Sequence, residues 1–558
     1  MLGRDVILDS LVAHGAEFVF GNPGTTEGPL VDNLAGHPSL SYIVSLHEGV
    51  SVGAASYYAQ ASGRAGIVNL HVAPGLGNAI GMLYGAMKAN SPMVVTAGQQ
   101  DTRLRLRAPL LGHDLVAMAA PVVKWSVQAE HADECADIMR RAFKAAHDPP
   151  AGPVFVALPI NVMEQETAIG AESGGAPYPA PHPDPAAVER LGEHILAAKA
   201  PVLVIGDDVA RARAGGAVTA LAEAIGAPIW VEIIRQHAAI PNHHPHLRGA
   251  LTYDAAGIAE EFGEADLVLM VGGPFFEEIW FSVGSPFPPG AKVLQIEESQ
   301  ARLGHNYALT AGLLGALKPT LEALNSMVRE QAPEDFRRAA ETRCKQQAAL
   351  TAAAASVRQT RIDAAVARRP PSTPMAMVLA MSVLAEAIPS EAIVVEEAIT
   401  GSPDLSAAFD FAGPGDYFCG RGGGIGQGLP GALGVQLAVP DRRVVCISGD
   451  GSAMYSITAL WTAAHHKLPI LFIILANREY RILKHNIDLY RTRFGIDTNR
   501  AYAHLDLHEP ALGFVNMAAG MGITGRRVTE PEELAAAVGE ALAAGEARLI
   551  EVAIEGKR

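Results

Sequence analysis

The sequence predicts an α/β protein built from three doubly wound parallel-sheet domains. Short apolar runs alternate with amphipathic stretches along most of the chain, which is the pattern of strands and crossover helices in parallel sheets. The chain has 558 residues, several times the usual size of one domain. We therefore expect the alternation to be divided among several domains.

The first group of strands lies between residues 18 and 159, with the runs FVFG, YIVSL, GIVNL, MVVTAG and VFVALP. Each run is followed by a loop and a helical pattern, so we expect an N-terminal domain over residues 1–167. The polar, proline-rich stretch 165–185 has neither a helical nor a strand period, and this is typical of an interdomain linker.

Two further groups of strands follow the linker. The runs PVLVIG, APIWVE, DLVLMVG and KVLQIE predict a middle α/β domain over residues 186–335. A charged, alanine-rich stretch over residues 332–369 predicts a helical connector. The runs AIVVEE, RRVVCISGDG, PILFIILAN and RLIEVAI then predict a C-terminal domain over residues 370–558.

Composition excludes several classes of protein. The chain has 43 Lys and Arg against 59 Asp and Glu, a formal charge of −16, and no dense basic run, so nucleic-acid and anionic-membrane partners are disfavoured. Its four cysteines are far apart and form neither a disulfide framework nor a metal motif. The first residues read as a helix rather than a signal peptide. We expect a cytoplasmic protein that acts on a small molecule.

The sharpest chemical motif lies in the third group of strands. One strand ends at Gly449-Asp450-Gly451-Ser452, a helix follows, and the next strand ends at Ala476-Asn477. A parallel strand-helix-strand unit brings the carboxyl ends of both strands side by side, so Asp450 and Asn477 can meet one ion. Mg²⁺ prefers such oxygen ligands, and Glu479 could add its main-chain carbonyl.

The residues around Asp450 suit a phosphate group. Gly449 and Gly451 allow close approach of the backbone, and the following helix begins with N–H donors and Ser452. A lone Gly-Asp-Gly is more often an incidental turn. The asparagine after the next strand favours a diphosphate–Mg²⁺ site instead.

This arrangement resembles the thiamine-diphosphate signature, with Ala476 in place of the first of two asparagines. Nearly the whole chain is similar to the decarboxylase and acetohydroxyacid synthase superfamily, and most of all to the benzoylformate decarboxylases. The segments that carry the resemblance are GNPGTTE (21–27), Glu48, NLHVAPGLGNAIG (69–81), SPMVVTAGQQ (91–100), VKWS (123–126), GVQLAVPDR (434–442) and GDGSAMYSITALWTAA (449–464).

The resemblance implies three catalytic residues. Glu48 would hydrogen-bond N1′ of the cofactor's aminopyrimidine, His71 would handle protons during the reaction, and Thr25 would contact the substrate carboxylate. Each has a structural alternative: a helix-capping carboxylate for Glu48, a structural histidine for His71 and a turn residue for Thr25.

The resemblance also implies the cofactor site. Ile425 matches the large aliphatic residue that supports the bent thiamine diphosphate, and Ile399 stands where a hydroxyl residue would be expected. The implied magnesium ligands are Asp450, Asn477 and Glu479. The further implied cofactor contacts are Asn22, Glu397, Thr400, Gly424, Gly449, Gly451, Ser452 and Tyr480.

Two features depart from the benzoylformate decarboxylase pattern. Ile279 stands where a second active-site histidine is expected, with no histidine nearby. The segment after Asn477 is strongly basic, and one of its cations could bind a second carboxylate or a phosphate of a substrate; charges on an exposed helix are the more common explanation. These cations are Arg478, Arg481, Lys484, Arg491 and Arg493.

We therefore expect non-oxidative decarboxylation of a 2-oxo acid, with possible carboligase activity. An acetohydroxyacid-synthase-like carboligase, a 2-hydroxyacyl-CoA lyase and a non-catalytic cofactor-binding regulatory protein are the alternatives. No clear GxGxxG motif follows PVLVIG, so nothing favours a nucleotide in the middle domain. In relatives Glu48 and Asp450 come from different subunits to one site, which implies a homo-oligomer, a dimer at least and a tetramer by expectation.

Overall fold

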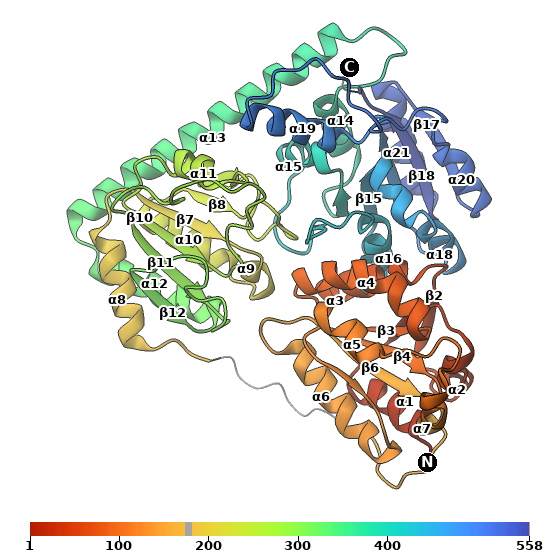
Figure 1. Cartoon of the computed structure of the whole chain (residues 1–558). Coiled ribbons are helices and arrows are strands. Elements are labelled where there is room, and N and C mark those ends of the chain that lie inside the picture. Colours follow the sequence, from red (N-terminus) through yellow and green to blue (C-terminus); the bar gives the residue numbers. More distant parts are fainter. Residues whose placement is uncertain (173–180, 557–558) are drawn as a thin grey trace. The chain divides into compact units, whose positions relative to one another are not determined.

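The computed structural model of the chain describes residues 1–172 and 181–556. Residues 173–180 of the expected linker, and residues 557–558, lie outside the described residues. The structure contains three six-stranded sheets whose paired strands run parallel, which confirms the predicted α/β class (Figure 1). The chain divides into two compact units. Unit 1 comprises Met1–Pro177, Arg368–Ala408 and Cys419–Arg558, and unit 2 comprises Tyr178–Ala367 and Phe409–Phe418.

The N-terminal sheet of unit 1 has the strand order β2-β1-β3-β4-β6-β5. Every residue of β3, β4 and β6 is buried, as expected for strands with helices on both faces of a parallel sheet. Its strands are β1 (Phe18–Gly21), β2 (Ser41–Val44), β3 (Gly66–Leu70), β4 (Met93–Gln99), β5 (Ser126–Gln128) and β6 (Pro153–Pro159). Its helices are α1 (Gly3–Ala13), α2 (Gly28–Asn33), α3 (Glu48–Ser62), α4 (Val72–Lys88), α5 (Leu115–Ala119), α6 (Cys135–His147) and α7 (Ile160–Met163).

The sheet of unit 2 has the order β12-β11-β10-β7-β8-β9. Its strands are β7 (Pro201–Ile205), β8 (Ile229–Val231), β9 (Leu247–Ala250), β10 (Leu267–Val271), β11 (Lys292–Glu297) and β12 (Ala311–Leu314). Its helices are α8 (Pro185–Ala197), α9 (Asp208–Arg211), α10 (Gly215–Ile225), α11 (Ala255–Phe262) and α12 (Leu317–Gln331), and the predicted connector is the long α13 (Glu334–Arg368).

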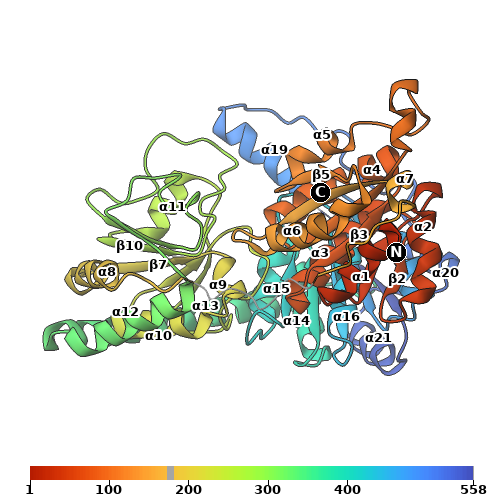
Figure 2. The same cartoon turned by 90° about the horizontal axis from the view of Figure 1, so that it is seen from below.

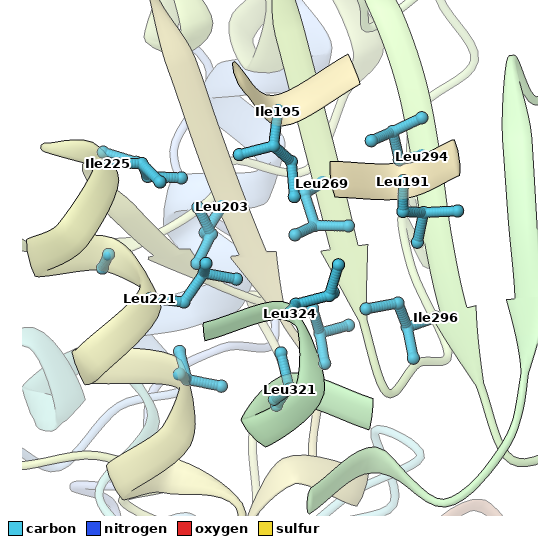
Figure 3. Close-up of a cluster of buried hydrophobic side chains, with 14 of the residues drawn as sticks. Leu191, Ile195, Leu203, Leu221, Ile225, Leu269, Leu294, Ile296, Leu321 and Leu324 are labelled. Atoms are coloured by element: carbon cyan, nitrogen blue, oxygen red, sulfur yellow. The ribbon is translucent and has the colours of Figure 1, made fainter. Parts of the chain in front are cut away.

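Alternate side chains of β7 enter two different cores, because successive residues of a strand point to opposite faces. Leu203 and Ile205 pack with α8, α10 and α12. Figure 3 shows Leu203 and Leu269 facing the leucines and isoleucines of these helices. Val202 and Val204 pack with α11 on the other face. Figure 2 accordingly shows α11 on one side of β7 and β10, with α10 and α12 on the other.

The C-terminal sheet has the order β14-β13-β15-β16-β18-β17. Its strands are β13 (Ile393–Glu397), β14 (Tyr417–Cys419), β15 (Val444–Gly449), β16 (Leu471–Ala476), β17 (Thr524–Val528) and β18 (Arg548–Ala553). The helices of this part are α14 (Met377–Ala387), α15 (Ser402–Ala408), α16 (Gly428–Ala438), α17 (Asp450–Ala453), α18 (Ala459–His465), α19 (Arg481–Arg493), α20 (Phe514–Gly520) and α21 (Pro531–Ala543). Among the described residues, no helix combines the length and apolarity needed to cross a bilayer.

Within unit 1, α3 packs closely against α16, so a helix of the N-terminal sheet meets a helix of the C-terminal one. A Cβ atom on Gly434 would lie 2.0 Å from the carbonyl oxygen of Ala54, and one on Gly431 would lie 2.7 Å from the ring of Tyr57. Glycine at these two positions allows the helices to approach, because a close-packed core has no space for further atoms.

We predict that Gly434→Ala lowers the stability of unit 1 by about 1–3 kcal/mol, the usual cost of overpacking a tight core. Gly539→Ala on α21 is the matched control, since a Cβ there meets no atom within 4 Å; the control should be neutral or stabilising by up to about 1 kcal/mol. Calorimetric unfolding of both variants measures the difference. Equal unfolding temperatures would contradict the close α3–α16 contact.

Candidate functional site

The three predicted catalytic residues follow strands at one edge of the N-terminal sheet. Thr25 follows β1 in a short 3-10 helix, Glu48 follows β2 and begins α3, and His71 follows β3. The carboxyl ends of parallel strands meet at the same edge, and active sites of open α/β sheets form there. The fold therefore brings these loops together.

His71 is held by a buried carboxylate. Its Nδ1 lies 2.7 Å from Oε2 of Glu27, whose side chain is fully buried. Glu27 also accepts the N–H groups of Gly24 and Gly98 and the hydroxyl of Thr26. Because a carboxylate only accepts, Nδ1 carries the proton, and Nε2 is left as the proton acceptor of the ring. The contact fixes both the tautomer and the orientation of the imidazole.

Glu48 has one engaged and one open oxygen. The amide of Asn78 donates to Oε2 at 3.0 Å, and the residue is 7% exposed. Within the described part of the chain, Oε1 has no hydrogen-bond partner. A Cβ atom on Gly75 would lie 3.2 Å from this oxygen, so the glycine keeps space in front of it. A buried carboxylate with one open oxygen suits a ligand that donates a hydrogen bond.

The loop after β1 lies against His71. A Cβ atom on Gly24 would lie 2.2 Å from Nδ1 of the imidazole, so only glycine allows this approach. Thr25 is exposed and Asn22 is partly exposed in the same loop. Both predicted residues therefore lie in the loop whose Gly24 contacts His71, and the side chain of Thr25 is accessible there.

Asp450 is buried at the carboxyl end of β15. Its Oδ1 accepts the N–H of Gly451 at 2.8 Å, and its Oδ2 accepts the N–H of Arg478 at 2.7 Å. Burial raises the pKa of Asp450 to about 6, although these backbone donors oppose the rise. A cation at this carboxylate would replace the missing solvent and favour its charged form.

The other two predicted magnesium ligands follow β16. Asn477 accepts the N–H of Glu479 through its amide oxygen at 3.0 Å. Arg478, between them, has φ +59°, a left-handed conformation that costs a non-glycine residue about 1–2 kcal/mol. This turn directs the Arg478 N–H to Asp450, so the hydrogen bond joins the ends of β15 and β16.

The predicted phosphate contacts surround Asp450. Gly449 and Gly451 flank it, and Ser452 is buried in the first turn of α17. The ring of Tyr480 covers Gly451, where a Cβ atom would lie 2.6 Å from it. Burial raises the pKa of the Tyr480 hydroxyl, with a further contribution from neighbouring Tyr455.

Glu397 organises the glycine-rich loop before α16. Its carboxylate accepts the N–H groups of Gly426, Gln427 and Gly428 at 2.7–3.1 Å. Burial raises the pKa of Glu397 to about 7, although the three donors oppose the rise. The side chain thus binds the backbone of the loop that presents Gly424 and Ile425, which are exposed and partly exposed.

The loop after β13 contains the two remaining positions. Thr400 is partly exposed in a 3-10 helix, directly after Ile399, which has φ +52° and an exposed side chain. A left-handed β-branched residue is an energetically costly conformation of the kind that is often retained at functional sites.

Most cations after Asn477 bind partners within the protein. Arg478 binds Glu551 and the carbonyl of Leu512, Lys484 binds Glu479 and Asp506, and Arg491 lies 3.7 Å from Asp488. Arg481 binds Glu479 through Nε at 3.0 Å. Ile279 is exposed in unit 2.

Sequence reasoning missed two residues of the site. Glu27 ends the segment GNPGTTE and Asn78 lies within NLHVAPGLGNAIG, so both were in motifs that carry the resemblance. The signal that could have identified them as site residues was a charged or amide side chain close to the end of a strand. Lys484 was considered only as one of several basic residues, and its burial could not be predicted from its neighbours.

The residues at the carboxyl-end edges of the N-terminal and C-terminal sheets fit thiamine diphosphate. One offers a buried carboxylate with an open oxygen, Glu48, and the other offers a buried carboxylate between glycines, Asp450. In the described residues no three His, Cys, Asp or Glu side chains are grouped to hold a metal. The predicted set contains a single carboxylate beside amide and carbonyl oxygens, which is the usual protein share of a Mg²⁺–diphosphate site.

Comparisons with known sequences match three parts of the chain to domains of one enzyme family. Residues 1–118 match "Thiamine pyrophosphate enzyme, N-terminal TPP binding domain". Residues 188–324 match the central domain of the same enzymes, and residues 400–552 match their C-terminal TPP binding domain.

Relatives match over almost the full length. Benzoylformate decarboxylase of Pseudomonas aeruginosa is 36% identical, over 97% of this chain and 96% of the relative. The large subunit of acetolactate synthase isozyme 3 of Escherichia coli is 26% identical, over 97% and 92%. Among solved structures, thiamine diphosphate-dependent 4-hydroxybenzoylformate decarboxylase of Rhodococcus jostii has a TM-score of 0.87 at 30% identity, with 100% of both chains covered.

The buried Glu397 predicts a pH-dependent stability. Its pKa in the folded protein, about 7, lies above the ordinary value of 4.5. The folded protein therefore binds more protons than the unfolded one between these values, and stability falls as pH rises through this range. Thermal unfolding from pH 5 to 7 should show a decline in wild type that is weaker in Glu397→Gln.

Glu533→Gln, an exposed residue of α21, is the control for this comparison and should retain the wild-type decline. If wild type and Glu397→Gln changed in parallel with pH, the buried carboxyl would not titrate as the structure indicates.

Proposed function

The chain belongs to the thiamine pyrophosphate enzymes related to benzoylformate decarboxylase and the acetolactate synthases, and on this basis we propose that it decarboxylates a 2-oxo acid without oxidation. Carbon–carbon lyase or ligase chemistry is common to these homologues. The observation that carries the finer proposal is the Glu27–His71 pair, a positioned proton-transfer group beside Glu48.

Residues of the chain would transfer the protons of the reaction. Thiamine diphosphate, when bound, would supply a nucleophilic carbon and would take up the electron pair that stays on the substrate carbon when CO₂ leaves. The open Oε1 of Glu48 would hold the proton at N1′ of the aminopyrimidine. Nε2 of His71 would accept or donate a proton at the substrate, because Glu27 keeps the proton of the ring on Nδ1. Thr25, exposed in the loop whose Gly24 contacts His71, would bind the substrate carboxylate.

The C-terminal edge would hold the other end of the cofactor. Asp450 and Asn477, with the carbonyl of Glu479, are the proposed Mg²⁺ ligands, and Gly449, Gly451 and Ser452 are the proposed diphosphate contacts. Burial of Asp450 between backbone donors supports this assignment, since the carboxylate is fixed before a ligand arrives.

We propose a homo-oligomer in the cytoplasm, at least a dimer and most simply a tetramer. The support for assembly is the implied sharing of a site between Glu48 of one subunit and Asp450 of another. Four free cysteines agree with a reducing compartment.

Carboligation is the second candidate function. Ile279 in place of a histidine favours it, because a decarboxylase must protonate its product carbon and a ligase need not. The identity to the decarboxylase relative, 36%, exceeds the 26% to the E. coli synthase and supports decarboxylation as the first choice.

Incubating protein with thiamine diphosphate, Mg²⁺ and single 2-oxo acids tests the proposal. The panel contains benzoylformate, pyruvate, a branched acid and a dicarboxylic acid, with CO₂ and products followed together. We expect CO₂ with one aldehyde per CO₂ for a preferred acid. Glu48→Gln should keep cofactor affinity within a few-fold and lose at least about 100-fold in kcat, the usual contribution of a general acid–base group.

Release of CO₂ with a 2-hydroxy-ketone as the main product would favour the carboligase. Normal turnover by Glu48→Gln would contradict the proposed proton relay, and no CO₂ from any acid would remove the decarboxylase proposal.

Asp450→Ala should abolish Mg²⁺-dependent binding of thiamine diphosphate, because the only carboxylate of the proposed metal site is removed. Calorimetric titration of cofactor with and without Mg²⁺ measures this. Asp404→Ala, an acidic residue of α15 outside the proposed ligand set, is the control. Unchanged cofactor affinity in Asp450→Ala would place the cation elsewhere.

A further inference from the structure

The first turn of α19 holds a cation with open hydrogen-bond donors. Arg481 begins this helix, directly after Tyr480, whose ring covers Gly451. It therefore belongs to the same strand-end segment as Asn477 and to the edge that carries Asp450. Its side chain is 16% exposed, so it is neither fully buried nor freely solvated.

Buried ion pairs fix the orientation of this guanidinium. Nε of Arg481 donates to Oε1 of Glu479 at 3.0 Å, while Lys484 binds the other oxygen of Glu479. Lys484 also binds Asp506 at 2.7 Å. The side chains of Glu479 and Lys484 are 4% and 5% exposed. Because Glu479 is immobilised, the plane of the Arg481 guanidinium is set by its Nε contact.

Arg481 is not the only counterion of Glu479. Lys484 already provides a counterion to this carboxylate, and the other partner of Lys484, Asp506, is 46% exposed and solvated. The only contact of Arg481 with this cluster among the described residues is the one through Nε. Within the described residues, the two Nη groups of Arg481 have no hydrogen-bond partner, and their edge matches a carboxylate in bidentate geometry.

The neighbouring cations do not offer such an edge. Arg478 and Lys484 are engaged by carboxylates, and Arg491 donates to the carbonyl of Arg500 and lies over the ring of Tyr502. Arg481 is thus the cation of this segment that is both oriented and open.

We propose that Arg481 determines substrate specificity by binding the second, distal carboxylate of a dicarboxylic 2-oxo acid. This inference rests on the proposed decarboxylase function and adds the substrate class to it. The shared chemistry is an anion with at least two oxygens, so a terminal phosphonate is the competing group, and the experiment separates the two.

The test compares 2-oxoglutarate with 2-oxohexanoate, which is similar in length but lacks the distal charge, using cofactor-loaded protein. We expect wild type to prefer 2-oxoglutarate at least tenfold in kcat/KM. Arg481→Gln should raise KM for 2-oxoglutarate by about 10- to 100-fold, the range of a lost charged hydrogen bond. The kcat/KM for 2-oxohexanoate should stay within about twofold of wild type, since its binding does not use the guanidinium.

Arg481→Lys keeps the positive charge but lacks the paired Nη donors. If the guanidinium binds the anion, this variant should have a KM for 2-oxoglutarate between those of wild type and Arg481→Gln. It also separates lost recognition from lost folding. Arg493→Gln removes one charge from the exposed end of the same helix and should leave the preference unchanged. Equal effects of Arg481→Gln on both acids, or of Arg493→Gln and Arg481→Gln, would overturn the proposal.

Two further measurements distinguish a carboxylate from a phosphonate ligand, and a failure of the anion site from a failure of the decarboxylase proposal. A wild-type preference for 3-phosphonopyruvate over 2-oxoglutarate would overturn the carboxylate assignment. Titration of glutarate, which lacks the 2-oxo group, reports the anion site without turnover: Arg481-dependent glutarate binding with no CO₂ from any acid would refute decarboxylation and support the anion site. Decarboxylation of neutral acids alone would refute the anion site and leave decarboxylation in place.

Discussion

Buried carboxylates that accept backbone N–H groups at the ends of parallel strands are the interaction on which the site depends. Asp450 joins the ends of β15 and β16, Glu397 holds the loop before α16, and Glu27 joins the loop after β1 to the carboxyl end of β4. A charged group removed from water is stable only if its hydrogen bonds are satisfied. Each carboxylate therefore restricts its loop to the few conformations that supply donors.

This constraint explains the glycines and the strained residues beside the carboxylates. Gly24 allows the loop after β1 to reach His71, and Arg478 adopts a left-handed conformation that brings its N–H to Asp450. The cost of such backbone is acceptable because a lost bond to a buried carboxylate would cost more. A cofactor that is bound at both ends also requires rigid loops at the sheet edge, because its two binding sites must keep a fixed geometry.

Much of the site could be predicted from sequence because it follows from periodicity and spacing. Strands of parallel sheets end at one edge, so Asp450 and Asn477 were predicted to meet, and Glu48 and His71 were placed at strand ends by a resemblance. Glu27 and Asn78 were not assigned, since what they contact depends on how loops distant in sequence fold over one another. Likewise the contacts of Glu397 with the backbone of the distant loop before α16 could not be predicted from its neighbours along the chain.

The amino-acid sequence by itself determined the three-sheet α/β architecture, the loops that carry the chemistry and the membership of a cofactor-dependent enzyme class, because strand periodicity and short motifs are local properties. Only the tertiary structure decided which charged side chains form ion pairs. The cations after Asn477 look alike in the sequence. In the structure Arg478 pairs with Glu551 and Lys484 with Glu479 and Asp506, while the Nη groups of Arg481 stay open among the described residues. Ion pairing depends on distances in space, and a one-dimensional pattern does not contain them.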